Sequence, residues 1–384
     1  MRKSKKIAII VSLLCILIGA AIMLGAWLSL RDTEPGIMQF EENTHTITDS
    51  FDQIYINTLN STVEILPSGD GTCRIVCDDN EKRYHEVSIR ETEDGTALSI
   101  IQHDEWKWYE TLGGVYWNHD PELTVYLPET VYGSLEVVSI GGNVTVAPDF
   151  RFQNTRISST SGNIVLTKLS ADQLGVYSIS GDIVLRSVQA EADIYLENVS
   201  GFTQAENVTA ATLALGTNSG DNVLDSVSSE QLNITSVSGN VTVINGNISS
   251  DTYIETSSGN VEITDSVCAG QSLSTNSGNL ALHSVRFDTL ALDTTSGCAE
   301  LFDVISKESI ILQSVSGELL FSGMDAQHIE IYSSSGSVSG SLLTPKEFIT
   351  ETASGYVEVP PSDEDAGLCF ISTASGDIII NMQS

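Results

Sequence analysis

Apolar and polar positions along most of this chain keep fixed distances from a Ser-Gly dipeptide that returns every 19 to 21 residues. Gly142, in Ser-Ile-Gly-Gly-Asn, begins the series. The glycines of the copies that follow are Gly162, Gly181, Gly201, Gly220, Gly239, Gly259, Gly278, Gly297, Gly317, Gly336, Gly355 and Gly376. A unit of this length cannot bury its own apolar face, so neighbouring copies must stack. The repeat therefore predicts a solenoid.

Within each unit, the spacing of apolar residues is that of β-strands. Most copies are apolar two and four residues after the glycine, and five and seven residues before it. Apolar positions two apart with polar residues between them predict half-buried strands. We therefore expect an all-β fold, a β-helix (β-solenoid) of about 13 rungs around a continuous aliphatic interior. A further inward residue is expected seven to nine positions after the glycine, as in Leu169, Val188, Val227, Val267 and Val285.

Two columns of hydroxyl side chains accompany the glycines. Ser or Thr stands three residues before the glycine in every copy except at Asn198, and Ser stands one before it in all but the first copy. Ser-Gly-Asn/Asp is turn chemistry, which we attribute to a glycine with positive φ. Hydroxyl ladders on a flat face can bind ice or a sugar lattice. Both columns share the parity of core positions, however, so we expect them to face inward and bond the turn backbone.

The N-terminus predicts a membrane anchor. Four basic residues lie within residues 1–6, and residues 7–30 carry no charge and are long enough to span a ~30 Å hydrocarbon core. The excess of positive charge before the apolar run predicts a cytoplasmic tail at 1–6, a transmembrane anchor in the cytoplasmic membrane at 7–30, and an extracytoplasmic remainder. A signal peptide cleaved near Gly19-Ala20-Ala21 is the alternative.

Residues 31–135 lack the period but stay β-like, so we expect a juxtamembrane linker and an irregular β cap there, followed by solenoid repeats over 136–384. An aromatic cluster within this segment is the candidate ligand-binding site. Clustered aromatic rings suit sugars, peptides or the membrane interface, and the alternative is that they pack the cap onto the rod. The candidate residues are Trp106, Trp108, Tyr109, Tyr116 and Trp117.

Charge and cysteine usage remove several classes of function. All 51 acidic residues but only 12 Lys and Arg follow Arg31, which excludes a nucleic-acid binder and disfavours docking on anionic surfaces. Cys73 and Cys77 lie on one strand, too far apart along it to bridge. The cysteines are expected to be buried free thiols. Neither cysteine nor histidine spacing indicates a metal site, and no metal or cofactor is predicted.

The order of these parts resembles the bacterial putative-adhesin family. The resemblance rests on four segments ahead of the Ser-Gly array, and it extends over about residues 40–384. It implies a β-solenoid displayed on the bacterial envelope, with the N-terminus in the cytoplasm and the C-terminal domain outside, and it supplies no catalytic residues. The segments are Phe51-Asp-Gln-Ile-Tyr-Ile, Ser61-Thr-Val-Glu-Ile-Leu-Pro-Ser, Leu123-Thr-Val-Tyr-Leu-Pro and Tyr132-Gly-Ser-Leu-Glu-Val.

These observations favour a non-enzymatic surface module that binds an envelope glycan or protein, as an adhesin would. The alternative is an envelope-stress signalling partner, a role the family resemblance suggests. A polysaccharide-active enzyme is the less favoured third hypothesis, because it needs paired carboxylates in a groove and the acidic residues are scattered. At the C-terminus the chain stops half a coil after Gly376, which predicts either self-association at an open strand edge or blunting by the Asp363-Glu-Asp loop.

Overall fold

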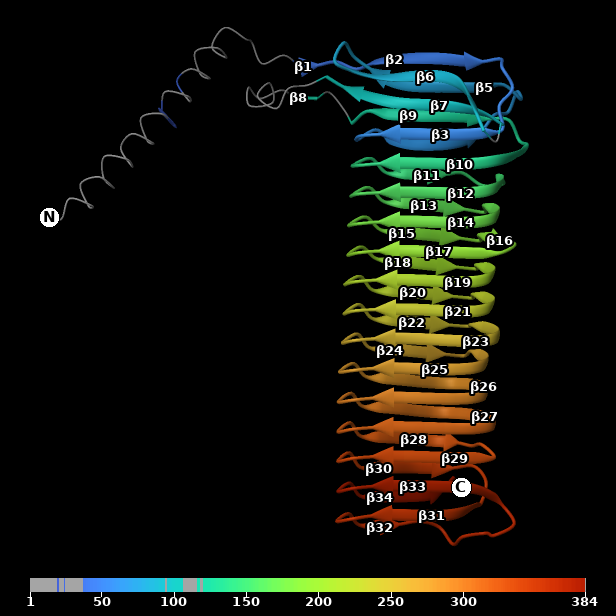
Figure 1. The fold of residues 1–384 in the computed structure, drawn as a ribbon, viewed down its shortest axis with the longest axis vertical. Helices are drawn as coiled ribbons and strands as arrows, with labels where there is room; N and C mark the ends of the chain where they lie inside the picture. The colour runs from blue at the N-terminus through green and yellow to red at the C-terminus, as the bar shows by residue number, and fades with distance from the viewer. Residues whose placement is uncertain are drawn as a thin grey trace, which may run out of the picture.

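The computed structural model describes residues 19–20, 24, 37–93, 95–105, 116–117 and 120–383. The repeats form a rod in which the chain coils around one long axis (Figure 1). The prediction of an all-β solenoid is confirmed, with about 12 turns, close to the 13 expected.

Each coil contributes one long strand and one short strand to two parallel faces of the rod. The Ser-Gly turn leads from the long strand to the short strand, and β26 (Leu280–Thr294) and β27 (Ala299–Ser314) each run through both faces. The long-face strands are β10 (Val131–Ser139), β12 (Arg151–Ser159), β14 (Ser170–Ser178), β16 (Gln189–Ala190), β17 (Asp193–Asn198), β19 (Thr209–Thr217), β21 (Ser228–Ser236), β23 (Asn247–Thr256), β25 (Val267–Thr275), β29 (His328–Ser333), β31 (Lys346–Thr352) and β33 (Gly367–Thr373). The short-face strands are β11 (Val144–Val146), β13 (Ile164–Thr167), β15 (Ile183–Arg186), β18 (Thr203–Glu206), β20 (Asn222–Asp225), β22 (Val241–Ile244), β24 (Val261–Thr264), β28 (Leu319–Met324), β30 (Val338–Leu342), β32 (Val357–Glu358) and β34 (Ile378–Met382).

One apolar core runs the length of the described rod. In-register parallel pairing sets Leu166 beside Val146 in one neighbouring coil and Leu185 in the other. Both leucines are 0% exposed, and one connected cluster of buried residues extends from Ile54 to Ile380. The predicted aliphatic columns therefore do share a dry interior, which is the main favourable term in the stability of such a rod.

The prediction that Val267 faces the interior is wrong. Its side chain is 55% exposed, although it was expected to face inward. The inward position there belongs to Ser266, whose Oγ donates to the carbonyl of Thr264 at 2.8 Å and accepts from the N–H of Gly246 at 2.9 Å. These two hydrogen bonds satisfy the buried hydroxyl, and the alternation of the strand then turns Val267 to solvent.

The glycines of the array are required by close backbone approach, and the expected positive φ is wrong for them. A Cβ built on Gly181 would lie 2.1 Å from the carbonyl oxygen of Gly162. On Gly239 it would lie 1.8 Å from the carbonyl oxygen of Gly220. From Gly162 onward, each turn glycine thus packs against the turn glycine of a neighbouring coil, so any side chain would force the coils apart.

Left-handed backbone lies instead at the opposite corner of the coil, between the short strand and the next long strand. Nine consecutive coils place a non-glycine residue there with φ between 47° and 74°. All are polar, and Asn and Asp tolerate this conformation better than other residues. They are Asp149, Lys168, Ser187, Asn207, Ser226, Asn245, Asp265, Ser284 and Asp303.

The two hydroxyl columns differ in burial. The column three before the glycine is buried as expected, except at the half-buried Thr352: Ser178 Oγ donates to the carbonyl of Gly181 at 2.8 Å and accepts from its N–H at 3.0 Å. The expectation is wrong for the column one before the glycine, which is exposed. These serines bond the neighbouring coil from outside, as Ser180 Oγ does to the carbonyl of Thr160 at 3.0 Å. Both columns are therefore structural.

The residue after the glycine forms a third ladder between coils. The backbone N–H of Asp182 donates to Oδ1 of Asn163 at 2.8 Å, and the N–H of Asn163 donates to Oδ1 of Asn143 at 2.9 Å. The exposed Asn and Asp side chains thus accept bonds from turn N–H groups that the strands leave unpaired, which is what such groups require.

The N-terminal end is closed by strands that are out of sequence order. Here β3 (Gln53–Thr58) lies between β10 and β7 (Gly95–Asp104), and β4 (Thr62–Pro67) lies between β11 and β9 (Glu122–Leu127). Antiparallel strands then complete both faces: β6 (Arg83–Thr92) pairs with β7, while β5 (Cys73–Asp79) pairs with β9 and with β2 (Glu41–Ile47).

At the C-terminal end, too, the coils do not stack in the order of the sequence, because the last coil of the chain is inserted between two earlier ones. Strand β33 pairs with both β29 and β31, and β34 pairs with both β30 and β32, so the last coil of the chain is the last but one of the rod (Figure 1). A buried ion pair reaches past the inserted coil: Lys346 Nζ lies 2.6 Å from Asp325 Oδ1. The outermost strands are therefore β31 and β32.

The acidic loop before β33 covers part of this outer edge. The backbone N–H of Phe348 donates to Ser362 Oγ at 2.8 Å, and the N–H of Asp363 donates to the carbonyl of Lys346 at 3.0 Å. These bonds use edge groups of β31 that another chain would need for strand addition. Self-association at the C-terminal edge stays a prediction.

The predicted anchor at 7–30 lies outside the described residues except for Gly19, Ala20 and Leu24. No helix among the described residues has the length and hydropathy needed to cross a bilayer. The anchor and the cytoplasmic tail stay predictions.

The glycine column predicts a strong contrast between two Gly→Ala substitutions. We expect Gly239→Ala to lower the free energy of unfolding by about 3 kcal/mol or more, because its Cβ would overlap backbone. The matched control is Gly216→Ala, whose Cβ would meet only Thr235 Oγ1, at 3.8 Å, and which should change stability by about 1 kcal/mol or less. Urea unfolding of both variants measures the difference. Equal stability of the two would refute close approach as the reason for the column.

Candidate functional site

Three of the five candidate aromatic residues lie outside the described residues: Trp106, Trp108 and Tyr109. The other two form β8 (Tyr116–Trp117), which pairs in parallel with β1 (Ile37–Met38). The pairing places this half of the aromatic segment beside the residues that follow the predicted anchor. Its role in ligand binding stays a prediction.

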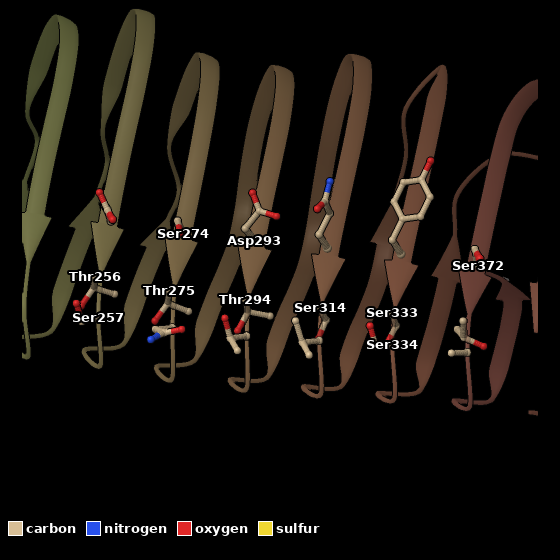
Figure 2. Close-up of a pocket in the computed structure, with 18 residues that line it drawn as sticks. Thr256, Ser257, Ser274, Thr275, Asp293, Thr294, Ser314, Ser333, Ser334 and Ser372 are labelled. Carbon is tan, nitrogen blue, oxygen red and sulfur yellow. The ribbon is translucent and has the colours of Figure 1, made fainter.

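A groove runs along the long-strand face beside the Ser-Gly turns (Figure 2). Its volume is about 670 Å³, and 18 residues line it. Every lining residue stands four, three or two positions before a turn glycine, so successive coils supply equivalent side chains. At about 4.8 Å per coil, the groove extends over about 24 Å. The column four before the glycine consists of Glu255, Ser274, Asp293, Gln313, Tyr332 and Ser372.

The three columns have different roles in the groove. The middle column is its floor, because hydroxyls such as those of Thr275 and Ser314 are buried and bonded to the turn glycines. The outer columns are available to a ligand and carry mostly hydroxyl, amide and carboxylate groups. The column nearest the turn consists of Ser257, Asn276, Thr295, Val315, Ser334 and Ala374.

The groove is acidic, with no basic residue among its lining residues. Glu255 and Asp293 supply the negative charge, and partial burial raises the pKa of the Asp293 carboxyl. Tyr332 adds an aromatic surface. Its hydroxyl donates to Glu330 at 2.9 Å, a bond that raises the pKa of the Tyr332 phenol. Its ring centroid lies 5.5 Å from that of Phe370.

The intercalated C-terminal coil completes one end of this groove. Ser372, Thr373 and Ala374 continue the columns beyond Tyr332, because β33 lies beside β29. The sequence order alone would have placed β31 there. The groove was therefore not predictable from the repeat, although the positions of its columns were.

The same surface continues toward the N-terminal end with a more apolar lining. Two hollows of about 610 and 320 Å³ lie there, and Tyr177, Glu197 and Val199 line both. The exposed aliphatic side chains of Ile140 and Ile179 border the smaller one. The long-strand face thus offers a polar stretch and an apolar stretch along one line.

A buried chain of polar side chains closes the N-terminal end of the glycine column. Ser61 takes the place of the turn glycine in the β3–β4 coil, since a Cβ on Gly142 would lie 1.9 Å from the carbonyl oxygen of Ser61. Its Oγ lies 3.2 Å from His85 Nε2 and accepts from Gln102 Nε2 at 2.8 Å. His85 Nδ1 lies 2.7 Å from Asp79 Oδ1.

These residues have the order of a Ser-His-Asp triad but not its access to substrate. Ser61 is 0% exposed, and a nucleophile must reach the bond it attacks. The network instead satisfies buried polar groups where no further turn glycine stacks. Sequence analysis missed it because 24 residues separate Ser61 from His85 and no motif joins them.

One group of potential metal ligands also comes together, which neither cysteine nor histidine spacing in the sequence had indicated. His45 lies close to Cys77 and Asp79 at the same end of the rod. The expectation of buried free thiols is confirmed for Cys73, Cys77, Cys268 and Cys369, while Cys298 is half-buried.

Fold and surface together define a repetitive β-solenoid with a groove along its axis. The chain belongs to the Toastrack DUF4097 family, whose model matches residues 51–245 and 223–365. The resemblance to the putative-adhesin family is thereby confirmed. No curated protein matches the chain significantly.

Three solved structures illustrate the likeness. A putative adhesin from Bacteroides fragilis has 14% identity and a TM-score of 0.40, over 65% of this chain and 98% of that one. A putative adhesin from Parabacteroides distasonis has 15% identity and a TM-score of 0.30, over 79% and 97%. A putative cell adhesion protein from Clostridium sporogenes has 9% identity and a TM-score of 0.21, over 90% and 100%. At these scores the likeness carries no inference about function.

The buried network predicts a specific dependence of stability on acid. Burial raises the pKa of Asp79, but hydrogen bonds from His85 and Asn43 outweigh it and hold the pKa below its usual value. A lowered carboxyl pKa contributes stability that is complete above about pH 5 and is lost as the pH falls through the folded-state value. With EDTA present, Asp79→Asn should cost about 2–4 kcal/mol at pH 7 and should lose less stability than wild type on going to pH 3.

Urea unfolding at the two pH values measures this effect. The control is Glu42→Gln, an exposed carboxylate on β2, which should change stability by about 0.5 kcal/mol or less at either pH. The same acid loss in Asp79→Asn and wild type would show that the Asp79 carboxylate contributes nothing.

Proposed function

We propose that this protein is a membrane-anchored, extracytoplasmic rod of the bacterial envelope that binds an envelope glycan along its groove without altering it chemically. The observation that carries the proposal is the groove itself, in which six coils repeat the same three positions over about 24 Å. A repeated set of contacts in a line suits a polymer better than a small molecule, which would fill one part of the groove.

The lining favours a neutral, hydroxyl-rich polymer. Hydroxyl and amide groups of residues such as Ser257, Asn276 and Gln313 can both donate to and accept from sugar hydroxyls. The exposed ring of Tyr332 offers an apolar surface of the kind that sugar rings cover. Glu255 and Asp293, together with a formal net charge of −34, disfavour an anionic polymer.

The predicted anchor and the aromatic segment support display at a membrane. Six residues separate the end of the anchor at Leu30 from Ile37, so β1 begins within about 25 Å of it. β8 pairs with β1 and carries Tyr116 and Trp117 into the same region. Tyr and Trp are enriched at membrane–water interfaces, so we propose that this segment lies near the headgroups.

One observation favours a second candidate, a glycan hydrolase. Glu255 and Asp293 stand two coils apart in one column, about 9.6 Å along the rod, near the upper limit for an inverting carboxylate pair. The raised pKa of Asp293 is the direction that a general acid needs. Both side chains are exposed on an open surface, however, whereas catalytic electrostatics needs a water-excluded site. We therefore propose binding without catalysis.

Co-sedimentation with insoluble peptidoglycan, stripped of anionic polymers, tests the binding. Wild-type chain should sediment with it, and Tyr332→Ala should weaken the apparent affinity about tenfold, since stacking on one ring contributes roughly 1–1.5 kcal/mol. Tyr253→Ala is the matched control: the two tyrosines are 40% and 39% exposed, both donate to a glutamate two residues away, and only Tyr332 lines the groove.

Two outcomes would overturn the proposal. Absence of sedimentation, or an equal loss in both tyrosine variants, would show that the groove does not hold the glycan. Release of reducing ends by the wild type, abolished in Asp293→Asn, would establish the hydrolase instead.

A further inference from the structure

Three side chains able to bind a metal ion meet where β2 covers the N-terminal end of the rod. They are the imidazole of His45, the thiol of Cys77 and the carboxylate of Asp79, and their ligand atoms all lie within 4.8 Å of one another. Cys77 Sγ lies 3.5 Å from Asp79 Oδ2. Tetrahedral Zn²⁺, with ligand distances of 2.0–2.3 Å, separates its ligand atoms by about 3.5 Å. The Cys77–Asp79 pair already has this separation.

We propose that His45, Cys77 and Asp79 form a Zn²⁺ site that fastens strand β2 to strand β5. The imidazole of His45 has to approach the other two ligands by about 1.3 Å at most to complete three sides of a tetrahedron. A water molecule takes the fourth position.

The surroundings of Asp79 hold its carboxylate in the orientation that a ligand needs. Oδ1 accepts from the backbone N–H of His85 at 3.0 Å and lies 2.7 Å from its Nδ1. Oδ2 faces the other way, toward Cys77 Sγ and toward Asn43 Nδ2 at 3.1 Å. Metal-ligating carboxylates are characteristically fixed by such hydrogen bonds from outside the coordination sphere. Oδ2 is therefore the ligand atom, and His85 is a positioning residue.

The ligand set selects the class of metal. One thiolate, one imidazole and one carboxylate suit Zn²⁺ and related transition metals, whereas Ca²⁺ and Mg²⁺ require oxygen ligands. Binding displaces the S–H proton of Cys77 to solvent, and the thiolate becomes the sulfur ligand. The strongly negative charge of the chain attracts cations to the site.

The position of the site on the rod provides an entry path and a role. Cys77 and Asp79 are buried, but His45 is half-buried on β2, which among the described strands pairs with β5 alone. Antiparallel register places Asn43 opposite Cys77 and His45 opposite Ile75, so the ligands come from both strands. A bridging ion would hold β2, the strand that follows the predicted anchor and β1 in the chain, against the rod.

Co²⁺ titration of the untagged full-length chain in detergent, after EDTA treatment, tests the site. A Co²⁺–thiolate bond gives a charge-transfer absorption that carboxylate or imidazole ligands do not give. We expect one Co²⁺ per chain, the thiolate band, and displacement of the band by Zn²⁺. Cys77→Ser should abolish the band, and His45→Ala should weaken Co²⁺ affinity at least tenfold.

Cys73→Ser is the matched control. Cys73 is buried on the same face of β5 as Cys77, about 13 Å away from it along the strand. It lies opposite Ile47, whose side chain cannot bind a metal ion. Its substitution should leave both the band and the affinity unchanged. The half-buried His45→Ala variant keeps the test decisive if Cys77→Ser does not fold, as judged by circular dichroism. Absence of a thiolate band in wild type, its retention in Cys77→Ser, or unchanged affinity in His45→Ala would refute the proposal.

Discussion

Contact between the turn glycines of neighbouring coils is the constraint on which the rest of the rod depends. The carbonyl oxygen of one turn glycine lies about 2 Å from where the Cβ of the neighbouring turn glycine would be. Because no Cβ is present, neighbouring coils can stack at the normal spacing of paired strands. Beside the turns the pairing register then stays constant, as Leu166 shows between Val146 and Leu185, and the register shifts of a few strand pairs lie farther from the turns. Constant register is what brings equivalent side chains into columns, both inside the rod and on its surface.

The ends of the rod solve a different problem from its middle. A stack of identical coils exposes unpaired strand edges at both ends, where fraying and association with other chains begin. Here the first and last coils of the array are held inside the stack. Strands β3 and β4 are covered by β7 and β9, which come later in the chain, and β33 and β34 are covered by β31 and β32. Neither end of the array can unwind without first breaking pairs on two sides.

Outward columns give the rod its chemistry. Only the inward positions of the repeat have to be apolar, so the outward positions are free to vary from coil to coil. The outward side chains change from apolar near Ile140 and Ile179 to polar and acidic near Asp293. The buried hydroxyl columns, in contrast, are committed to the turn backbone. Surface variation on a constant core is how a repeat protein acquires a binding face.

The sequence by itself determined the repeat, the strand spacing and the identity of the core columns, because these follow from local alternation that every copy states again. The alternation of inward and outward residues placed the buried hydroxyls correctly. It was wrong for the exposed serines, which lie at a corner of the coil, and for Val267, where Ser266 occupies the inward position instead. The explanation of the glycines by positive φ was also wrong, because close approach between neighbouring coils cannot be seen within one copy of the repeat.

Only the tertiary structure decided which coils lie beside one another at the two ends, and so where the groove ends and which ligands meet. Tyr332 neighbours Ser372, and His45 reaches Cys77 and Asp79, because strands far apart in the chain pair there. No periodic signal marks those pairings. Their energies come from contacts between unlike segments, which a repeat pattern does not encode.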